Sequence, residues 1–99
     1  MLFRSLTASQ LRERRSNVDG VVLVDVRDPG EVADGMIESA LHIQLASLLE
    51  GAKTLDPKSP TVVYCAGGYR SSIAASTLRS LGFADVSDIV GGFGAWRQS

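Results

Sequence analysis

Two runs of β-branched apolar residues limit what this chain can fold into. They span residues 21–26, where only Asp25 is polar, and residues 61–64. A strand of this composition is covered on both faces, as in a parallel sheet. Residues that favour helices lie between these two strand segments and after the second one, so we expect strands to alternate with helices. The sequence therefore predicts an α/β fold: an open, mostly parallel sheet of about five short strands with helices on both faces.

The N-terminal segment carries a helix-starting motif. Thr7 and Gln10 have the spacing of a capping box, in which each side chain bonds the backbone N–H of the other residue. This predicts a helix over residues 8–15. Residues 1–5 loosely resemble a transit peptide but lack the apolar core of a signal peptide. We expect them to be part of the fold.

A second, shorter helix is predicted after the first apolar run. Asp28 suits its N-cap, Pro29 its first position and Glu31 its third, and the helix is expected to end near Asp34, before Gly35. Other short elements are expected as a strand at 40–43, a helical turn or two at 45–49, a strand at 86–90 and a terminal helix at 93–98.

A longer helix is predicted over residues 71–81, with Gly82 as its left-handed C-cap. The side chains at helical spacing that we expect on its buried face are Ile73, Ala74, Thr77, Leu78 and Leu81.

Charge and hydropathy exclude two classes of partner. Ten basic and eleven acidic residues are interspersed and give a net charge of −1. No basic patch stands out, so we expect no nucleic-acid partner. No apolar stretch approaches membrane-spanning length, so we expect no membrane partner.

The chain has one cysteine, Cys65, and one histidine, His42. A lone cysteine forms no intramolecular disulfide, and this pair cannot by itself build a closed zinc site. We therefore expect neither a metal nor another cofactor. A free thiol fits a reducing compartment, so the expected location is cytoplasmic.

Cys65 sits where a thiolate is favoured. The strand at 61–64 runs straight into it, and Gly67 and Gly68 then lead into the long helix. Glycines let successive backbone N–H groups turn toward one point, and the first amides of the helix add partial positive charge. Arg70 adds a full positive charge. Such surroundings lower a thiol pKa below its usual value of about 8.5, and the thiolate is the reactive form.

The alternative for Cys65 is a buried, inert thiol, which is what most free cysteines are. A packing cysteine is expected within a strand, whereas Cys65 follows the strand and precedes Gly67 and Gly68. The combination with Arg70 favours a reactive group.

Residues 65–71 resemble the active-site loop of the rhodanese family, whose pattern is Cys-x-x-Gly-x-Arg-Ser. Residues 24–27 are similar to the family's Asp-Val-Arg strand, with Glu31 at the usual spacing. Residues 35–40 resemble its Gly-His-Ile-x-Gly-Ala segment, and residues 91–96 its closing Gly-Gly-x-x-Ala-Trp. Together these segments span most of the chain, a specific match of motif and context.

The resemblance implies a single rhodanese-like domain over residues 1–99 with sulfurtransferase activity. Cys65 would be the catalytic nucleophile and would carry the transferred sulfur as a persulfide. The donor would be thiosulfate or a persulfide, and the acceptor a thiol or cyanide. Arg70 would steer the donor, and Tyr69 is expected to be exposed. The residues that would bind the substrate are Ala66, Gly67, Gly68, Tyr69, Arg70 and Ser71.

Two other functions are considered. A chain this small has little room for a deep acceptor pocket, so it could be a sulfur-relay or regulatory module acting on a partner protein. The weaker alternative is a phosphatase or arsenate reductase. Relatives with those activities have a loop one residue longer, usually preceded by His, whereas here four residues separate Cys65 from Arg70 and Tyr64 precedes. Ala66 stands where some thiosulfate-using relatives have a basic residue, which leaves a persulfide donor equally open.

Several polar and aromatic residues are expected to be structural. Asp25 and Arg27 project to the same side of their strand at its carboxyl end, and we expect them to form hydrogen bonds to adjacent loops. His42 lies on a predicted core strand, far along the chain from Cys65. Phe93 and Trp96 are expected to anchor the last helix in the core.

Overall fold

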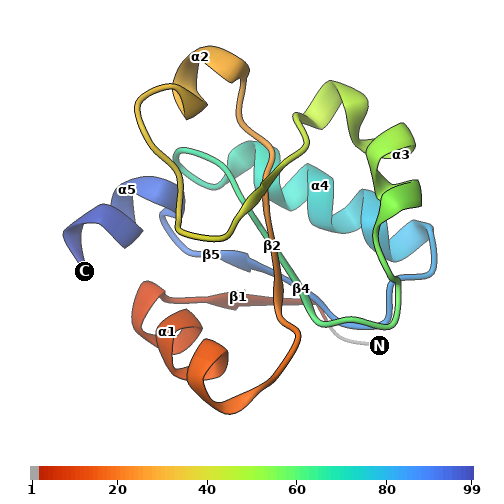
Figure 1. Ribbon diagram of the computed structural model, residues 1–99, viewed down its shortest axis with the longest axis horizontal. Helices are drawn as coiled ribbons and strands as arrows, with labels where there is room; N and C mark the ends of the chain where they lie inside the picture. Colours follow the sequence, from red (N-terminus) through yellow and green to blue (C-terminus); the bar gives the residue numbers. More distant parts are fainter. Residues whose placement is uncertain (1–2) are drawn as a thin grey trace.

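The computed structural model describes the backbone of residues 3–99 and the side chains of residues 5–99; Met1 and Leu2 of the predicted domain lie outside the described residues. Five strands form one sheet in the order β1-β5-β4-β2-β3, and all of its pairs are parallel (Figure 1). The α/β prediction is confirmed. The strands are β1 Phe3–Leu6, β2 Val22–Asp25, β3 Leu41–His42, β4 Thr61–Tyr64 and β5 Val86–Ile89.

Helices cover both faces of this sheet. Side chains alternate along β4, so Val63 packs in one core with Leu78, and Val62 packs in the other with Leu11 and Phe93. No helix of the described chain is long and apolar enough to cross a membrane. The helices are α1 Ala8–Asn17, α2 Pro29–Val32, α3 Leu48–Gly51, α4 Tyr69–Ser80 and α5 Gly92–Gln98, with 3-10 turns η1 Leu45–Ser47 and η2 Ala52–Thr54.

Strand β1 is the element that sequence patterning did not locate. It pairs with β5, with Phe3 opposite Val86 and Leu6 opposite Ile89. Its four residues, Phe-Arg-Ser-Leu, place two polar positions in the middle and show no strand pattern. The neighbouring edge of β5 therefore decides its conformation, as expected where strand propensity depends on context. The expectation that the N-terminal segment belongs to the fold agrees with β1 for residues 3–5.

The predicted helix signals are present. The Thr7 N–H donates to Gln10 Oε1 at 2.9 Å and the Gln10 N–H to Thr7 Oγ1 at 3.1 Å, which completes the capping box. Gly82 has φ +94° after α4, and the next N–H, of Phe83, closes back to the Leu78 carbonyl. Helix α2 begins after Asp28 as expected but already ends at Val32.

The buried face of α4 differs from the predicted one. Ile73 and Leu81 are 41% and 45% exposed. Ala74 and Leu78 are buried as predicted, and the other buried side chains are those of Ser71 and Ala75. The buried stripe begins with a serine, so a search for apolar residues at helical spacing shifts part of the stripe to the exposed side.

The fold places Cys65 where ligands usually bind in such sheets. Cys65 directly follows β4. From β4 the chain continues to β5, which lies toward one edge of the sheet, whereas from β2 it continues to β3 at the opposite edge. The connections after β2 and β4 therefore diverge at their carboxyl ends. Open α/β sheets bind ligands at this kind of switch point.

We predict opposite outcomes for two leucines of α4. Leu78→Ala removes a fully buried side chain and should lower the free energy of unfolding by about 2–5 kcal/mol. Leu81→Ala changes a half-exposed side chain and should cost less than about 1 kcal/mol. Urea denaturation measures both. Equal losses would show that the buried stripe has been assigned wrongly.

Candidate active site

The sulfur of Cys65 lies among backbone donors. Its Sγ accepts the Gly68 N–H at 3.0 Å and the Ser71 N–H at 3.4 Å. Gly68 has φ +121°, a conformation that turns the loop toward the sulfur and favours glycine. Ser71 is in the first turn of α4, where N–H groups have no partner inside the helix. Cys65 itself is only 1% exposed. The cysteine is buried, and its surroundings on the loop side are polar.

Helix α5 sets the direction of two other amides of the loop. The N–H of Phe93 donates to the Cys65 carbonyl at 2.8 Å, and that of Gly94 to the Ala66 carbonyl at 3.3 Å. In a planar trans peptide, N–H and C=O point in opposite directions. Because these two carbonyls point at α5, the N–H groups of the same peptides, on Ala66 and Gly67, point away from it. The loop therefore presents carbonyls to α5 and amides to its other side.

These donors favour the thiolate of Cys65. Burial of the thiol works to raise its pKa, but hydrogen bonds from the side chain and N–H of Ser71 and from the amides of Gly68 and Gly67 outweigh burial. The pKa of Cys65 therefore lies below its ordinary value. Of the backbone amides predicted to form a cradle, those of Gly68 and Ser71 donate to Sγ. The Ser71 hydroxyl itself donates to the Gly68 carbonyl at 3.0 Å and lies 3.4 Å from Asp88 Oδ2, a contact that sequence reasoning had not identified.

The positive charge of Arg70 is balanced by a carboxylate from α2. Arg70 Nη1 and Nη2 donate to the two carboxylate oxygens of Glu31 at 2.6 and 2.9 Å. These bonds, followed by that from the Asp28 N–H, lower the pKa of Glu31 to about 2, and the pairing raises the pKa of Arg70. The sequence shows no acidic residue between Asp56 and Asp85, but the fold brings one in from 39 positions earlier. Arg70 is thus fixed at the loop as half of an ion pair.

Asp25 and Arg27 form the hydrogen bonds to adjacent loop segments that the sequence predicts. Arg27 pairs with Asp25 at 2.6 Å and donates to the Gly35 carbonyl at 2.6 Å, and both charged residues are buried. The guanidinium carbon lies 4.2 Å from the ring centroid of Phe93, which joins this pair to α5. His42 Nε2 lies 2.8 Å from the Arg27 carbonyl. His42 is exposed on the edge strand β3, and not on a core strand as predicted.

The aromatic residues of α5 anchor that helix. Phe93 is buried and stacks on Tyr64 with ring centroids 6.2 Å apart, and Trp96 packs at the margin of the same core. Tyr69 is 79% exposed on the loop, as expected.

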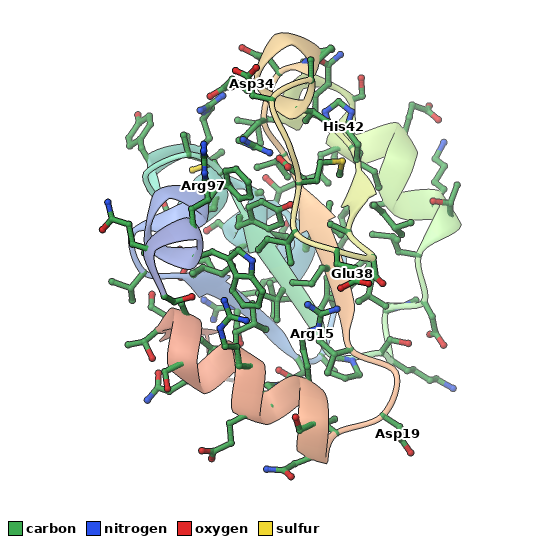
Figure 2. All side chains as sticks on the ribbon, turned by 60° about the vertical axis from the view of Figure 1, so that its left-hand side comes forward. Arg15, Asp19, Asp34, Glu38, His42 and Arg97 are labelled. Carbon is green, nitrogen blue, oxygen red and sulfur yellow. The ribbon has the colours of Figure 1, made fainter. Side chains whose placement is uncertain are left out.

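A cavity of about 250 Å³ adjoins the loop at Ala66. Phe93 and Gly94 of α5 form part of its wall. Charged side chains of both signs also line it, among them Asp34 and Arg97, which lie at the same end of the molecule (Figure 2). Arg97 is a cation near the loop that the sequence did not single out. The cavity thus reaches the loop at Ala66, and Cys65 is not among the residues that line it.

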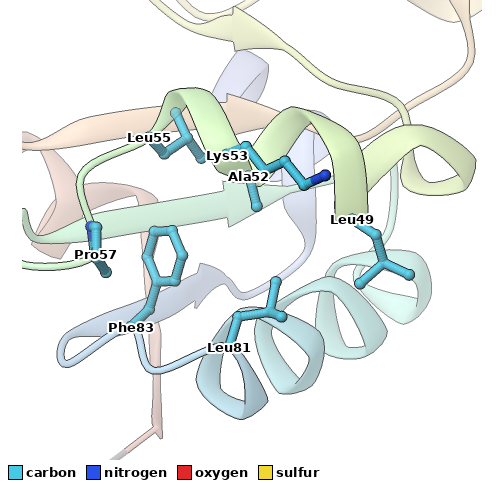
Figure 3. A pocket seen from close by; sticks show the side chains of 7 residues that line it. All are labelled: Leu49, Ala52, Lys53, Leu55, Pro57, Leu81 and Phe83. Carbon is cyan, nitrogen blue, oxygen red and sulfur yellow. The ribbon is translucent and has the colours of Figure 1, made fainter.

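A larger cavity of about 320 Å³ lies elsewhere (Figure 3). Leu49, Leu81 and Phe83 are among its mostly apolar lining residues. Pro57, which precedes β4, also lines it, so this cavity is at the amino ends of the strands, opposite Cys65. Among the described residues, no group of three or more His, Cys, Asp or Glu side chains gathers where it could hold a metal ion.

A substitution at Gly92 tests how closely α5 must approach the loop. It has φ +59°, and a Cβ there would clash with the Cys65 carbonyl and lie 2.6 Å from the Ala66 carbonyl oxygen. We predict that Gly92→Ala displaces the loop and slows alkylation of Cys65 at neutral pH on the order of tenfold or more. Iodoacetamide labelling followed by mass spectrometry measures the rate.

Gly82→Ala is the matched control. Gly82 also has positive φ, +94°, but open space surrounds it. Its substitution adds backbone strain of roughly 1–2 kcal/mol without touching the loop. Cys65 should keep its alkylation rate in this variant. A Gly92→Ala protein that reacts as fast as the control would show that the approach of α5 does not shape the site.

Comparison with known proteins agrees with this geometry. The family model described as Rhodanese-like domain matches residues 7–99. The chain is 38% identical over 97 residues to the thiosulfate sulfurtransferase GlpE of Pseudomonas putida, covering 98% of this chain and 87% of the relative.

Solved structures of similar proteins share the fold. A rhodanese-related protein from Thermoplasma volcanium superposes with a TM-score of 0.85 at 33% identity and covers 96% of this chain and 91% of its own. A Rhodopseudomonas palustris protein, described as of unknown function and a possible tyrosine phosphatase, has a TM-score of 0.81 at 37% identity. The match covers 97% of this chain and 80% of that protein. From its sequence match and its fold, this chain belongs to the rhodanese-like domain family.

Proposed function

We propose that residues 1–99 act as one rhodanese-like domain that transfers sulfane sulfur through a persulfide on Cys65. The donor is thiosulfate or a persulfide, and the acceptor is a thiol or cyanide. The observation that carries this proposal is the pair of N–H groups, of Gly68 and Ser71, that Cys65 Sγ accepts at the end of β4. The thiosulfate sulfurtransferase relative supports the reaction class.

Loading needs a nucleophilic thiolate. Cys65 Sγ attacks the outer sulfur of thiosulfate, an S–S bond forms to the enzyme, and the S–S bond within thiosulfate breaks. Sulfite leaves with the electron pair, and the persulfide remains on Cys65. The lowered pKa of Cys65 increases the fraction of the attacking thiolate, and the mechanism that we propose uses no separate general base.

Discharge uses the same sulfur as a leaving group. An acceptor thiolate attacks the outer sulfur of the persulfide and forms its own persulfide, and Cys65 Sγ departs with the electron pair. The amides of Gly68 and Ser71 stabilise the negative charge that returns to Sγ. They play the same part for an anionic persulfide while it is held.

The rest of the loop is proposed to bind the donor. The backbone of Ala66, Gly67 and Tyr69 completes the ring from Cys65 to Arg70. Arg70 is paired with Glu31, which offsets its charge, so we propose that it contacts an anionic donor through guanidinium N–H groups outside that pair. Because a free thiolate must stay reduced, we propose a reducing, cytoplasmic setting for the reaction.

A second candidate is a relay module that passes its sulfur to a partner protein. Two observations favour it: the cavity beside the loop is small, about 250 Å³, and Tyr69 is 79% exposed on the loop. Exposed tyrosines are common anchors in protein interfaces. Such a module would load from small donors but turn over slowly with cyanide or small thiols. Rapid turnover with these acceptors alone would count against it.

The phosphatase and arsenate reductase hypotheses remain the weaker alternatives. The Rhodopseudomonas palustris relative, described as a possible tyrosine phosphatase, is the observation in their favour. Four residues between Cys65 and Arg70 make a small ring, which suits one sulfur atom better than a tetrahedral oxyanion. Release of phosphate from p-nitrophenyl phosphate that depends on Cys65 would revive this candidate.

The persulfide is tested by weighing the intact protein. After incubation with thiosulfate, or separately with glutathione persulfide, and removal of the excess, we expect a mass gain of one sulfur atom per chain. Cyanide or dithiothreitol should remove the added sulfur, and thiocyanate or sulfide should appear in equal amount.

Cys65→Ser is the control, because the chain has no other cysteine. It should gain no sulfur and release no product with either donor. If the wild-type protein stays unmodified by both donors, or the serine variant gains the same mass, the proposed persulfide mechanism is wrong.

A further inference from the structure

Two carboxylates flank the guanidinium of the active-site loop. Glu31 accepts Arg70 Nη1 and Nη2 at 2.6 and 2.9 Å, and Asp28 Oδ2 lies 3.9 Å from Nη1. The side chains of Arg70 and Glu31 are 30% and 34% exposed, so the pair lies at the protein surface and not in the core. An arginine beside a reactive thiolate would attract anions, but here its charge is offset before any substrate arrives.

The cavity beside the loop has no excess of positive charge. Arg27, which lines it, is bound to Asp25 at 2.6 Å. The charged residues of the loop, of its ion pairs and of the cavity lining are three arginines and four acidic residues: Arg27, Arg70 and Arg97, and Asp25, Asp28, Glu31 and Asp34. Clefts that recruit anions carry an excess of cations. The described residues of this region carry none, so a dianion gains little by approaching from this side.

The two classes of donor proposed for Cys65 differ in charge. Thiosulfate is a small dianion without a positive group. The persulfide of an amino acid such as cysteine carries an ammonium group beside its carboxylate, and Asp34 and Arg97 line the cavity with the two opposite charges. In loading from such a donor, Cys65 Sγ attacks the outer sulfur, which keeps its proton. The S–S bond of the donor breaks, and the donor thiolate leaves with the electron pair.

We propose that Glu31 is a specificity-determining residue that disfavours thiosulfate and so biases loading toward amino-acid persulfides, which carry an ammonium group. This inference rests on the proposed sulfurtransferase function and narrows its donor. Glu31 acts through its charge, because it offsets the one cation of the loop that the second negative charge of thiosulfate could use. The bonds from Arg70 hold the pKa of Glu31 at about 2, so the carboxylate is ionised wherever the thiolate reacts.

Two substitutions separate the charge of Glu31 from its position. Glu31→Gln removes the charge and keeps the start of α2, because glutamine also serves at the third position of a capping box. Its side-chain oxygen can still accept the Asp28 N–H, which donates to Glu31 Oε1 at 3.0 Å. Glu31→Asp keeps the charge near Arg70 but shortens the side chain that holds the guanidinium.

The first test compares two donors, thiosulfate and cysteine persulfide, with cyanide as the common acceptor. In Glu31→Gln, the ratio of kcat/KM for thiosulfate to kcat/KM for cysteine persulfide should rise by roughly three- to tenfold, because one negative charge is removed from the approach of a dianion. The rise should come chiefly from a lower KM for thiosulfate. At high salt it should be smaller, since exposed charges are screened.

The second test needs no sulfur donor. Iodoacetate and iodoacetamide alkylate the same thiolate, but only iodoacetate is charged, so the ratio of their rate constants reports on the electrostatic field at Cys65. Glu31→Gln should raise the ratio of iodoacetate to iodoacetamide by roughly two- to threefold, and Glu31→Asp should leave it near the wild-type value. In the wild-type protein, the ratio should fall by less than about twofold from low to high salt, because no net positive field is present to be screened.

Glu38→Gln is the matched control. It removes the same charge from the chain, but Glu38 lines a different cavity, near Arg15 and apart from Asp34 and Arg97 (Figure 2). It should change neither the donor ratio nor the alkylation ratio.

Three results would overturn the proposal. The first is an unchanged or lower ratio in Glu31→Gln, or an equal rise in Glu38→Gln. The second is an equal rise in Glu31→Asp, which would show that Glu31 only positions Arg70. The third is a wild-type preference for iodoacetate that salt abolishes, which would reveal an excess of positive charge. Failure of persulfide loading in the wild type would instead contradict the proposed function, and the alkylation ratios would still measure the effect of Glu31 on the field.

Discussion

The site depends on the orientation of three peptide groups: those that join residues 65–66 and 66–67, and the one that carries the Ser71 N–H. A loop around a sulfur atom can present either carbonyls or amides to it, and only amides stabilise a thiolate. Here the first turn of α5 binds the carbonyls of Cys65 and Ala66, so the amides of those peptides face the other way. The start of α4 adds the Ser71 N–H on the sulfur. Two helix N-termini therefore act on one loop, one by holding its carbonyls and the other by donating to the thiolate.

Burial and hydrogen bonding oppose each other at this sulfur. A nearly buried thiol without donors would stay protonated and inert, as most buried cysteines are. With donors at hydrogen-bond distance, the same burial excludes water and makes each bond count for more. The position of Cys65 at the end of the central strand β4 gives it both properties. The chemical role proposed for the chain thus follows from where the strand ends as much as from the residue type.

Local patterns predicted the parts of the structure that local interactions decide. Strand β4, the Thr7–Gln10 capping box and the turn at Gly82 were predicted from neighbouring residues, because short-range sterics and hydrogen bonds determine them. Strand β1 was not, because only its pairing with β5 makes it a strand. The buried face of α4 was predicted only in part, at Ala74 and Leu78, because its stripe begins with the polar Ser71.

The residues of the candidate site also fall into those that local sequence predicts and those that only the fold brings together. Cys65 and the glycines could be selected because a thiol before a glycine pair at a helix start has a direct electrostatic consequence. The partners that come from distant segments could not. Glu31 reaches Arg70 from α2, and Asp88 reaches Ser71 from β5, and no pattern within the loop reports either contact. The capping position of Glu31 hinted at a structural role, but not at the guanidinium that it binds.

The most direct test of the central claim is the pH at which Cys65 ionises in the wild-type protein. Because the chain has one cysteine, the pH dependence of iodoacetamide alkylation reports on that thiol alone. The backbone donors predict a midpoint clearly below the value of about 8.5 for a free cysteine. A midpoint at or above that value would mean that burial prevails over the amides, and it would contradict the account of the site.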